Sequence, residues 1–196
     1  MITTEQVKEL RDATGVSVMQ CKKALEESGG DMEKALLILK KKSADIAAKK
    51  GDRALGAGAV ASYVHGGSVG AMVLLSCETD FVAKNDEFKA LAYDIAMQVA
   101  ATAPEFNRKE NIPEESIKAV REMFLKDVAD LKKDEVMKDK ILDGKVDAYF
   151  KDKILLEQTF IKDESLTVRS LIEKFVQKFG ERIEVAMFSR FSVAGK

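Results

Sequence analysis

Two adjacent patterns of apolar residues limit the folds open to this chain. Residues 71–75 (AMVLL) form a short continuous apolar run flanked by glycines, which is typical of a buried strand. Over residues 88–102 the apolar residues instead recur every three or four positions, which predicts one buried face of a helix. Asn85 can cap that helix, and the two acidic residues after it suit the positive end of the helix dipole. We therefore expect a strand followed closely by a helix that begins near residue 86.

The connection between them, residues 78–84, places Phe81 between an acidic and a basic residue. The pattern leaves two interpretations open. Phe81 either folds back onto the core, as most aromatic side chains do, or it stays exposed beside a carboxylate and anchors a protein–protein contact.

The composition excludes several classes of function. The chain has 196 residues, of which 46% are hydrophobic and 33% charged, so it can hold one ample core or a small and a larger domain. A net charge of −1 gives no general attraction to nucleic acid. His65 is the one histidine and no GxSxG motif accompanies it, so we expect no enzyme, no cofactor and no metal site. The glycine-rich residues 51–58 lack the lysine and hydroxyl residue of a phosphate-binding loop, and we interpret them as a flexible linker.

The cysteines and the N-terminus indicate a compartment. Cys21 and Cys77 are far apart and form no CxxC pair, so neither a disulfide framework nor a zinc site is predicted. The N-terminus lacks a basic segment followed by an apolar core, and no apolar run approaches the length of a membrane span. We expect a soluble cytoplasmic protein that is neither exported nor bound to a membrane.

Residues 1–42 show three helical patterns separated by glycines. Thr3 and Ser17 each have a glutamine three residues later, which predicts two capping boxes, and Asp31 is a third N-cap. The three helices would make a compact bundle of ubiquitin-associated type, a size typical of binding modules. The apolar stripes predicted to be buried are Val7, Leu10, Val18, Cys21, Ala24, Leu25, Ala35, Leu36 and Leu39.

The apolar periodicity fades after residue 43, and glycines follow. We therefore divide the chain into a partner-binding domain, residues 1–54, and a core and dimerisation domain, residues 55–196. The lysines of residues 40–53 are either a solvated helix surface or a contact for RNA or an acidic partner.

The core domain mixes strands and helices. Alternating residues over 59–77 predict a β-hairpin, and two apolar stripes predict a helical coiled-coil hairpin at about 114–152. A last helix closed by Gly180 precedes a strand in which alternate residues over 183–193 are predicted to share one apolar face. The predicted fold class is α+β, with the three-helix bundle followed by an antiparallel sheet, flanking helices and the helical hairpin.

The run from Cys77 to Asn85 (CETDFVAKN) resembles the signature of the bacterial translation elongation factor Ts family, the nucleotide-exchange factors of elongation factor Tu. Further similarity lies in residues 14–25, 63–66 (YVHG) and 155–161 (LLEQTFI), so that the resemblance covers essentially the whole chain. The family has a methionine pair where this chain has Val18 and Met19.

The resemblance implies guanine-nucleotide exchange on GDP-bound elongation factor Tu during translation elongation, without covalent chemistry. Phe81 would insert between helices of the GTPase domain and shift the elements that hold magnesium, while Asp80 orders the connection or pairs with the partner. The residues implied to dislocate magnesium are Thr79, Asp80, Phe81 and Val82. The residues implied to make secondary contacts with elongation factor Tu are Val18, Met19 and His65.

The family also includes longer forms with two similar core halves, whereas this chain has room for one. We therefore expect a homodimer through the sheet of residues 59–193. From the net charge of −1 we expect no direct contact with nucleic acid. Two other interpretations stay open. A ubiquitin-associated-like adaptor would bind its partner through residues 1–50 alone, and a small RNA-binding protein using the lysines of residues 40–53 would lose affinity steeply with salt.

Overall fold

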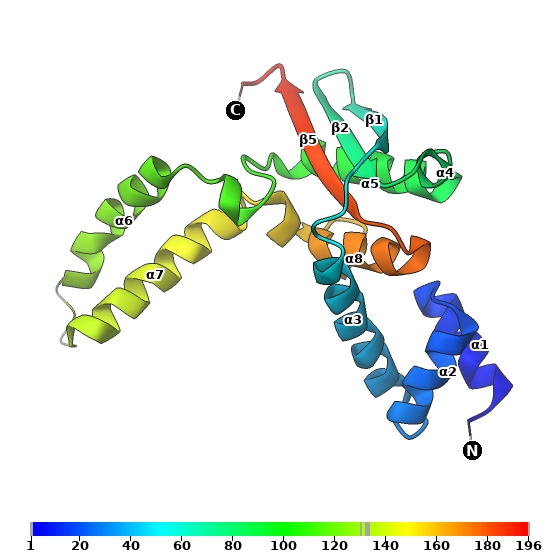
Figure 1. Ribbon diagram of the computed structural model, residues 1–196. Helices are drawn as coiled ribbons and strands as arrows, with labels where there is room; N and C mark the ends of the chain where they lie inside the picture. The colour runs from blue at the N-terminus through cyan, green and yellow to red at the C-terminus, as the bar shows by residue number, and fades with distance from the viewer. Residues whose placement is uncertain (1, 130, 132–133, 196) are drawn as a thin grey trace.

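The computed structural model describes residues 2–129, 131 and 134–195 and has a mixed architecture of helices and antiparallel strands. Figure 1 shows a central sheet and its helices, with a pair of long helices projecting to one side and the N-terminal helices to the other. The predicted α+β class is therefore correct. No helix of the described ranges is both long and apolar enough to cross a membrane.

Local capping starts the three N-terminal helices where the sequence predicts. Thr3 and Gln6 form a reciprocal capping box on α1 (Thr4–Thr14). Ser17 caps α2 (Val18–Glu27) and Asp31 caps α3 (Met32–Lys49) by accepting backbone N–H bonds in the first turn. The second predicted capping box is incomplete, because Gln20 does not return a hydrogen bond to the Ser17 backbone. Gly15 ends α1 at φ 69°, a left-handed conformation that glycine adopts without a Cβ clash.

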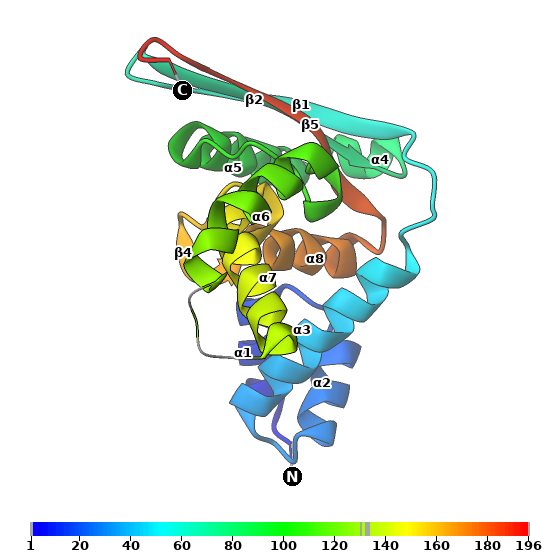
Figure 2. The same ribbon diagram turned by 90° about the vertical axis from the view of Figure 1, so that its left-hand side faces the viewer.

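The third helix is longer than the fading periodicity predicts. Its first half places Ala35 and Leu39 in the core of the bundle. Its second half continues to Lys49 and packs Ile46 and Ala47 against the main core, so that one helix belongs to both cores. Figure 2 shows α3 running from the other two helices up to α8 (Val168–Phe179). The division of the chain after residue 54 stays a prediction.

Two predicted members of the bundle stripe are exposed. Val18 and Leu36 both face solvent, whereas Cys21, Leu25 and Leu39 are buried. Helical spacing identified the apolar positions, but a short bundle buries only the part of each stripe that faces its neighbours. The prediction of burial is therefore wrong for Val18 and Leu36.

The main core consists of three layers. Strands β1 (Ala57–His65), β2 (Val69–Cys77) and β5 (Ile183–Ser192) form an antiparallel sheet in the order β1-β2-β5. Helix α5 (Asp86–Thr102) covers one face of this sheet, and α8 (Val168–Phe179) packs beneath α5 (Figure 2). Because α5 lies between two layers, it buries residues on most of its circumference, including Phe88, Leu91, Ala92, Ile95, Ala96 and Val99.

The predicted linker is partly strand. Residues 57 and 58 belong to β1, and a Cβ added to Gly58 would lie 2.5 Å from the carbonyl oxygen of Leu75 on β2. This glycine is needed for the close approach of two strands, not for flexibility. The interpretation of residues 51–58 as a flexible linker is therefore wrong at its C-terminal end.

A β-bulge changes the faces of β5. The pairing with β2 shifts by one residue between Leu74 and Leu75, so that Ala186 is an extra residue on β5. An extra residue reverses the inward and outward alternation of a strand. Val185, before the bulge, is buried, whereas Met187, after it, is exposed. The prediction of a single apolar face along this strand is therefore wrong.

The projecting helices are α6 (Glu114–Ala129) and α7 (Glu135–Lys151), which pack against each other (Figure 1). Their bounds agree with the predicted helical hairpin, although residues 130, 132 and 133 between them lie outside the described residues. At their base is a small core of Ile112, Val120, Val146, Phe150 and Ile154. Short helical turns η1 (Lys109–Asn111) and η2 (Leu155–Glu157) and strands β3 (Thr159–Phe160) and β4 (Asp163–Thr167) connect this pair of helices to the sheet and to α8.

Candidate partner-binding site

The connection between β2 and α5 contains a single helical turn, α4 (Asp80–Ala83). The Thr79 hydroxyl oxygen accepts a hydrogen bond from the backbone N–H of Val82 at 3.5 Å, and the Asn85 side chain accepts one from Glu87 at 2.8 Å. Both residues are therefore helix caps, and the segment they enclose has a defined conformation. We call residues 79–84 the capped turn.

Phe81 and Val82 point in opposite directions from the capped turn. Phe81 is 81% exposed, so the interpretation that it folds back onto the core is wrong. Val82 is 3% exposed and packs in the main core. Val82 is thus placed to anchor the turn and not, as the resemblance implies, to reach a partner with its own side chain.

Asp80 forms an ion pair within the capped turn. Its Oδ2 atom accepts a hydrogen bond from the Lys84 ammonium at 2.5 Å, and both side chains are exposed. This hydrogen bond and the positive charge of Lys84 hold the pKa of Asp80 below its usual value. Asp80 therefore carries a negative charge that already has one partner, which agrees with an ordering role in the turn.

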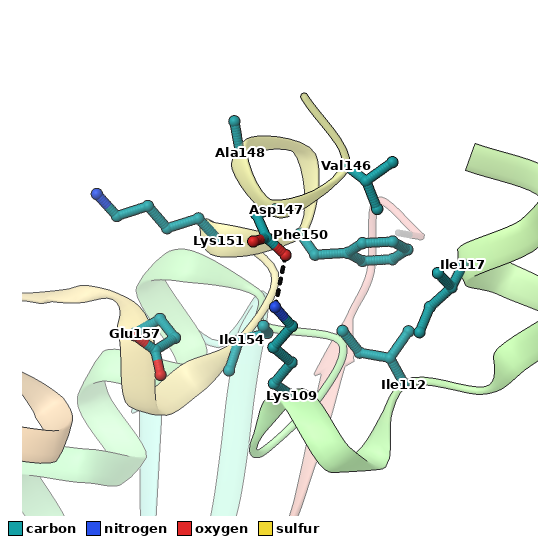
Figure 3. A pocket seen from close by; sticks show the side chains of 10 residues that line it. All are labelled: Lys109, Ile112, Ile117, Val146, Asp147, Ala148, Phe150, Lys151, Ile154 and Glu157. Carbon is teal, nitrogen blue, oxygen red and sulfur yellow. Dashed lines mark hydrogen bonds and ion pairs between the residues drawn. The ribbon is translucent and has the colours of Figure 1, made fainter. Parts of the chain in front are cut away.

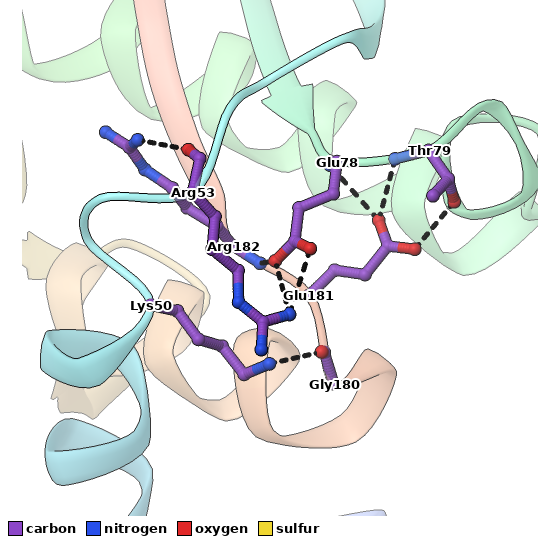
Figure 4. A network of polar contacts seen from close by, with 7 residues as sticks. All are labelled: Lys50, Arg53, Glu78, Thr79, Gly180, Glu181 and Arg182. Atoms are coloured by element: carbon purple, nitrogen blue, oxygen red, sulfur yellow. Dashed lines mark hydrogen bonds and ion pairs between the residues drawn. The ribbon is translucent and has the colours of Figure 1, made fainter.

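Glu181 contacts the capped turn from the link between α8 and β5. Its Oε2 atom accepts the backbone N–H groups of Glu78 (3.1 Å) and Thr79 (3.0 Å), and its Oε1 atom accepts the Thr79 hydroxyl at 2.6 Å (Figure 4). No local sequence pattern marks Glu181, because it follows the glycine that ends α8 and lies 102 residues from Thr79.

Glu78 makes the reciprocal contact. Its carboxylate accepts the backbone N–H of Arg182 at 2.6 Å and the guanidinium of Arg53 at 3.0 Å (Figure 4). Burial acts to raise the pKa of Glu78, but these two hydrogen bonds outweigh it and hold the pKa below its usual value. Glu78 is therefore ionised at neutral pH and joins three segments of the chain.

The other residues implied to contact a partner lie on two separate surfaces. Val18 and Met19 are both exposed in the first turn of α2, so their side chains are accessible to a partner. In Figure 1, α2 and α4 lie on the same side of the molecule. His65 is exposed at the far end of the edge strand β1, where its Nδ1 atom lies 2.9 Å from the Tyr63 hydroxyl. The structure therefore does not bring His65 next to Phe81.

The sheet face opposite α5 is open and apolar. Cross-strand pairs place Leu74 between Val60 and Met187, and Gly70 between Val64 and Phe191. Between these rows, Met72 lies between Ser62 and Ser189. The exposed apolar members of this face are Val60, Val64, Met72, Met187 and Phe191. Residues 71–75 are thus buried on one face only, which corrects the prediction of a fully buried run.

A cavity of about 360 Å³ lies at the base of α6 and α7 (Figure 3). Ile112, Ile117 and Phe150 contribute apolar surface, and an ion pair between Lys109 and Asp147 (2.6 Å) crosses its edge. This lining offers apolar contact and one ion pair, not a nucleophile with its base. Among the residues that the structure describes, no cluster of three or more histidine, cysteine or acidic side chains could hold a metal ion.

Comparison with known proteins gives one consistent result. Residues 41–195 match the family model described as Elongation factor TS. The elongation factor Ts of Carboxydothermus hydrogenoformans is 46% identical over 194 residues, which cover 98% of this chain and 89% of the relative. The elongation factor Ts of Thermotoga neapolitana is 46% identical over 193 residues, which cover 98% of this chain and 97% of that relative. The elongation factor Ts of Coprothermobacter proteolyticus is 45% identical over 193 residues, with 98% of both chains covered.

Proposed function

This chain belongs to the elongation factor Ts family, and on that premise we propose that it is a guanine-nucleotide exchange factor for elongation factor Tu in translation elongation. It binds the GDP-bound form in the cytoplasm and promotes release of GDP, without a covalent step. The observation that carries the proposal is the ring of Phe81, which is 81% exposed on a turn that Thr79 caps and that buried Val82 attaches to the core.

The mechanism is differential binding. A partner can speed nucleotide release only if it binds more tightly to the state in which the contacts to phosphate and magnesium are broken, and this coupling acts equally in both directions. Phe81 inserts between helices of the GTPase domain and displaces the elements that hold magnesium. Thr79 and Asp80 keep the capped turn in shape, and buried Val82 attaches it to the core. An exposed aromatic residue on a rigid support suits this role, since anchors of this kind dominate interface energies.

The N-terminal bundle provides a second contact with the same GTPase domain. Exposed Val18 and Met19 form its apolar contact surface. The bundle is of ubiquitin-associated type, residues 1–54 act as the partner-binding domain, and α6 and α7 form a coiled coil. His65 adds a contact from the end of edge strand β1.

The open face of the sheet is the surface of a homodimer. One core half leaves this apolar face without a covering layer, and a second copy can cover it with the same residues in a two-fold arrangement. Exposed apolar patches of this kind typically mark association surfaces. Residues 55–196 are therefore the dimerisation domain as well as the support of the capped turn.

Release of fluorescent GDP from elongation factor Tu tests the proposed function directly. The chain should accelerate release, and unlabelled GDP at saturating concentration prevents rebinding of the label. Release at the spontaneous rate would overturn the proposal. Equal binding of residues 1–50 alone would instead favour an adaptor, and binding to RNA that falls steeply with salt would favour an RNA-binding protein.

A further inference from the structure

Two carboxylates hold the ends of β2 and β5 together beyond the last pair of the sheet. The ladder between these strands ends at Cys77 and Ile183. Beyond that pair, the segment after β2 leads to α4, and the segment before β5 comes from α8. The N–H groups of Glu78 and Thr79 bind the Glu181 carboxylate, and the N–H of Arg182 binds the Glu78 carboxylate. We call Glu78, Glu181 and the groups they bind the carboxylate clasp (Figure 4).

We propose that Glu181 is a positioning residue for nucleotide exchange, because it fixes the capped turn and thereby the direction of the Phe81 ring. This inference rests on the proposed function. Glu181 binds two successive backbone N–H groups and the hydroxyl of Thr79, the residue that caps α4. Phe81 follows this cap by two residues, so a change in the position of Thr79 redirects the ring.

The Thr79 hydroxyl links the Glu181 carboxylate to the capped turn. A hydroxyl group has one proton to donate and lone pairs to accept with. Because its proton points to Glu181, at 2.6 Å, a lone pair remains for the backbone N–H of Val82, at 3.5 Å. The carboxylate therefore selects the rotamer of Thr79 that caps the helix, and the capped amide lies directly after Phe81.

The opposite side of the turn is held from the core. The Cys77 thiol donates a hydrogen bond to the Thr79 carbonyl oxygen at 3.2 Å. Burial, helped by the negative charge of Glu181, raises the pKa of this thiol, so it stays protonated and can donate. Contacts from Cys77, Val82 and Glu181 thus restrain the turn from different directions while Phe81 remains exposed.

The carboxylate clasp also reaches the segment that follows α3. Arg53 binds Glu78, and the Arg182 guanidinium donates to the Arg53 carbonyl oxygen at 2.5 Å. Lys50 donates to the Gly180 carbonyl oxygen at 2.5 Å. The capped turn and the end of α3, which carries the bundle, therefore share one support. A rigid support lowers the entropy that is lost when the two surfaces bind one partner.

Substitution of Glu181 in the full-length chain tests this role. Glu181→Ala should slow GDP release about tenfold, as expected for loss of hydrogen bonds to a charged group. Glu181→Gln should fall between this variant and the unmodified chain, because its amide oxygen still accepts the two backbone N–H bonds. Glu164→Ala is the matched control, since Glu164 is an exposed carboxylate on β4 outside the carboxylate clasp. Its release rate should equal that of the unmodified chain.

A double-mutant cycle separates positioning from general weakening of the fold. The Kd for nucleotide-free elongation factor Tu is measured for Glu181→Ala, Phe81→Ala and the double variant. If Glu181 acts through the ring, Glu181→Ala should raise Kd about tenfold in the unmodified chain and less than about twofold when Phe81 is already alanine. An equal effect in both backgrounds would overturn the inference.

Amide hydrogen exchange provides a readout that is independent of the partner. The amides of Thr79 and Val82 should exchange faster in Glu181→Ala, while those in the middle of α5 keep their rates. If the unmodified chain does not accelerate GDP release, the proposed function fails, whatever the amides show. A different outcome overturns only the inference about Glu181. In that outcome, the unmodified chain accelerates GDP release, Phe81→Ala accelerates it much less, and Glu181→Ala accelerates it normally with unchanged amide exchange rates.

Discussion

Replacement of Phe81 by alanine separates an interface role from a structural one. The Phe81 side chain is 81% exposed, so its truncation removes little buried surface. We expect the free energy of unfolding to fall by less than about 1 kcal/mol, as for substitutions away from the core. Phe88 is the matched control, because it is the same residue type, lies on the adjacent helix and is fully buried in the main core. Phe88→Ala should cost about 3–5 kcal/mol of stability.

The effect of Phe81→Ala on exchange should be much larger than its effect on stability. Loss of a central aromatic anchor typically costs about 2 kcal/mol or more of binding free energy. If that contact forms mainly in the nucleotide-releasing state, exchange should slow by about thirtyfold. The two measurements are the thermal melting of the variant and its rate of fluorescent GDP release from elongation factor Tu. A stable variant with unimpaired exchange would refute the proposed insertion of Phe81 into the GTPase domain. A large drop in melting temperature would show that the ring supports the core.

Three further perturbations test other parts of the structure. Met72→Lys places a charge at the centre of the open sheet face and should give a monomer in light scattering at micromolar concentration. Leu125→Lys, at an exposed position on α6, should leave the dimer intact. A dimeric Met72→Lys protein would show that this face is not the dimer surface. Gly58→Ala should lower the free energy of unfolding by about 1–3 kcal/mol in denaturant titrations, because the new Cβ meets the Leu75 carbonyl oxygen; unchanged stability would mean that the strands separate freely. The pKa of Glu78 is lowered in the folded state, so its stabilisation is present above the usual carboxyl pKa of about 4.3 and is lost as the pH falls through the lowered value. Glu78→Gln should lack this pH-dependent part of the free energy of unfolding. If the variant and the unmodified chain show the same dependence of stability on pH, Glu78 is not the group responsible.

Local signals in the sequence located most elements of the fold. Thr3, Asp31 and Asn85 were predicted as caps, and each accepts a backbone hydrogen bond within the next three residues. The bulge at Ala186 could not be predicted in this way. It depends on how β5 pairs with β2, a strand more than a hundred residues earlier in the chain.

The candidate site shows the same limit. The sequence correctly predicted that Phe81 lies in the connection between a strand and a helix, but spacing alone could not show that Phe81 points outward while Val82 points inward. That difference follows from a cap at Thr79 and a core below the turn. Glu181 had no local signal, because its role arises only when the ends of β2 and β5 meet.

The length of α3 determines the distance and the relative orientation of the bundle and the capped turn. The helix has 18 residues and therefore spans about 27 Å, and it contributes to the core at each end. One residue inserted between Leu39 and Ser43 would turn the bundle by about 100° relative to the sheet and point Met19 toward a different side. The number of residues in α3 thus sets the direction in which the exposed surface of the bundle faces. Insertions and deletions that preserve exchange should therefore fall in the loops on either side of α3, not within it.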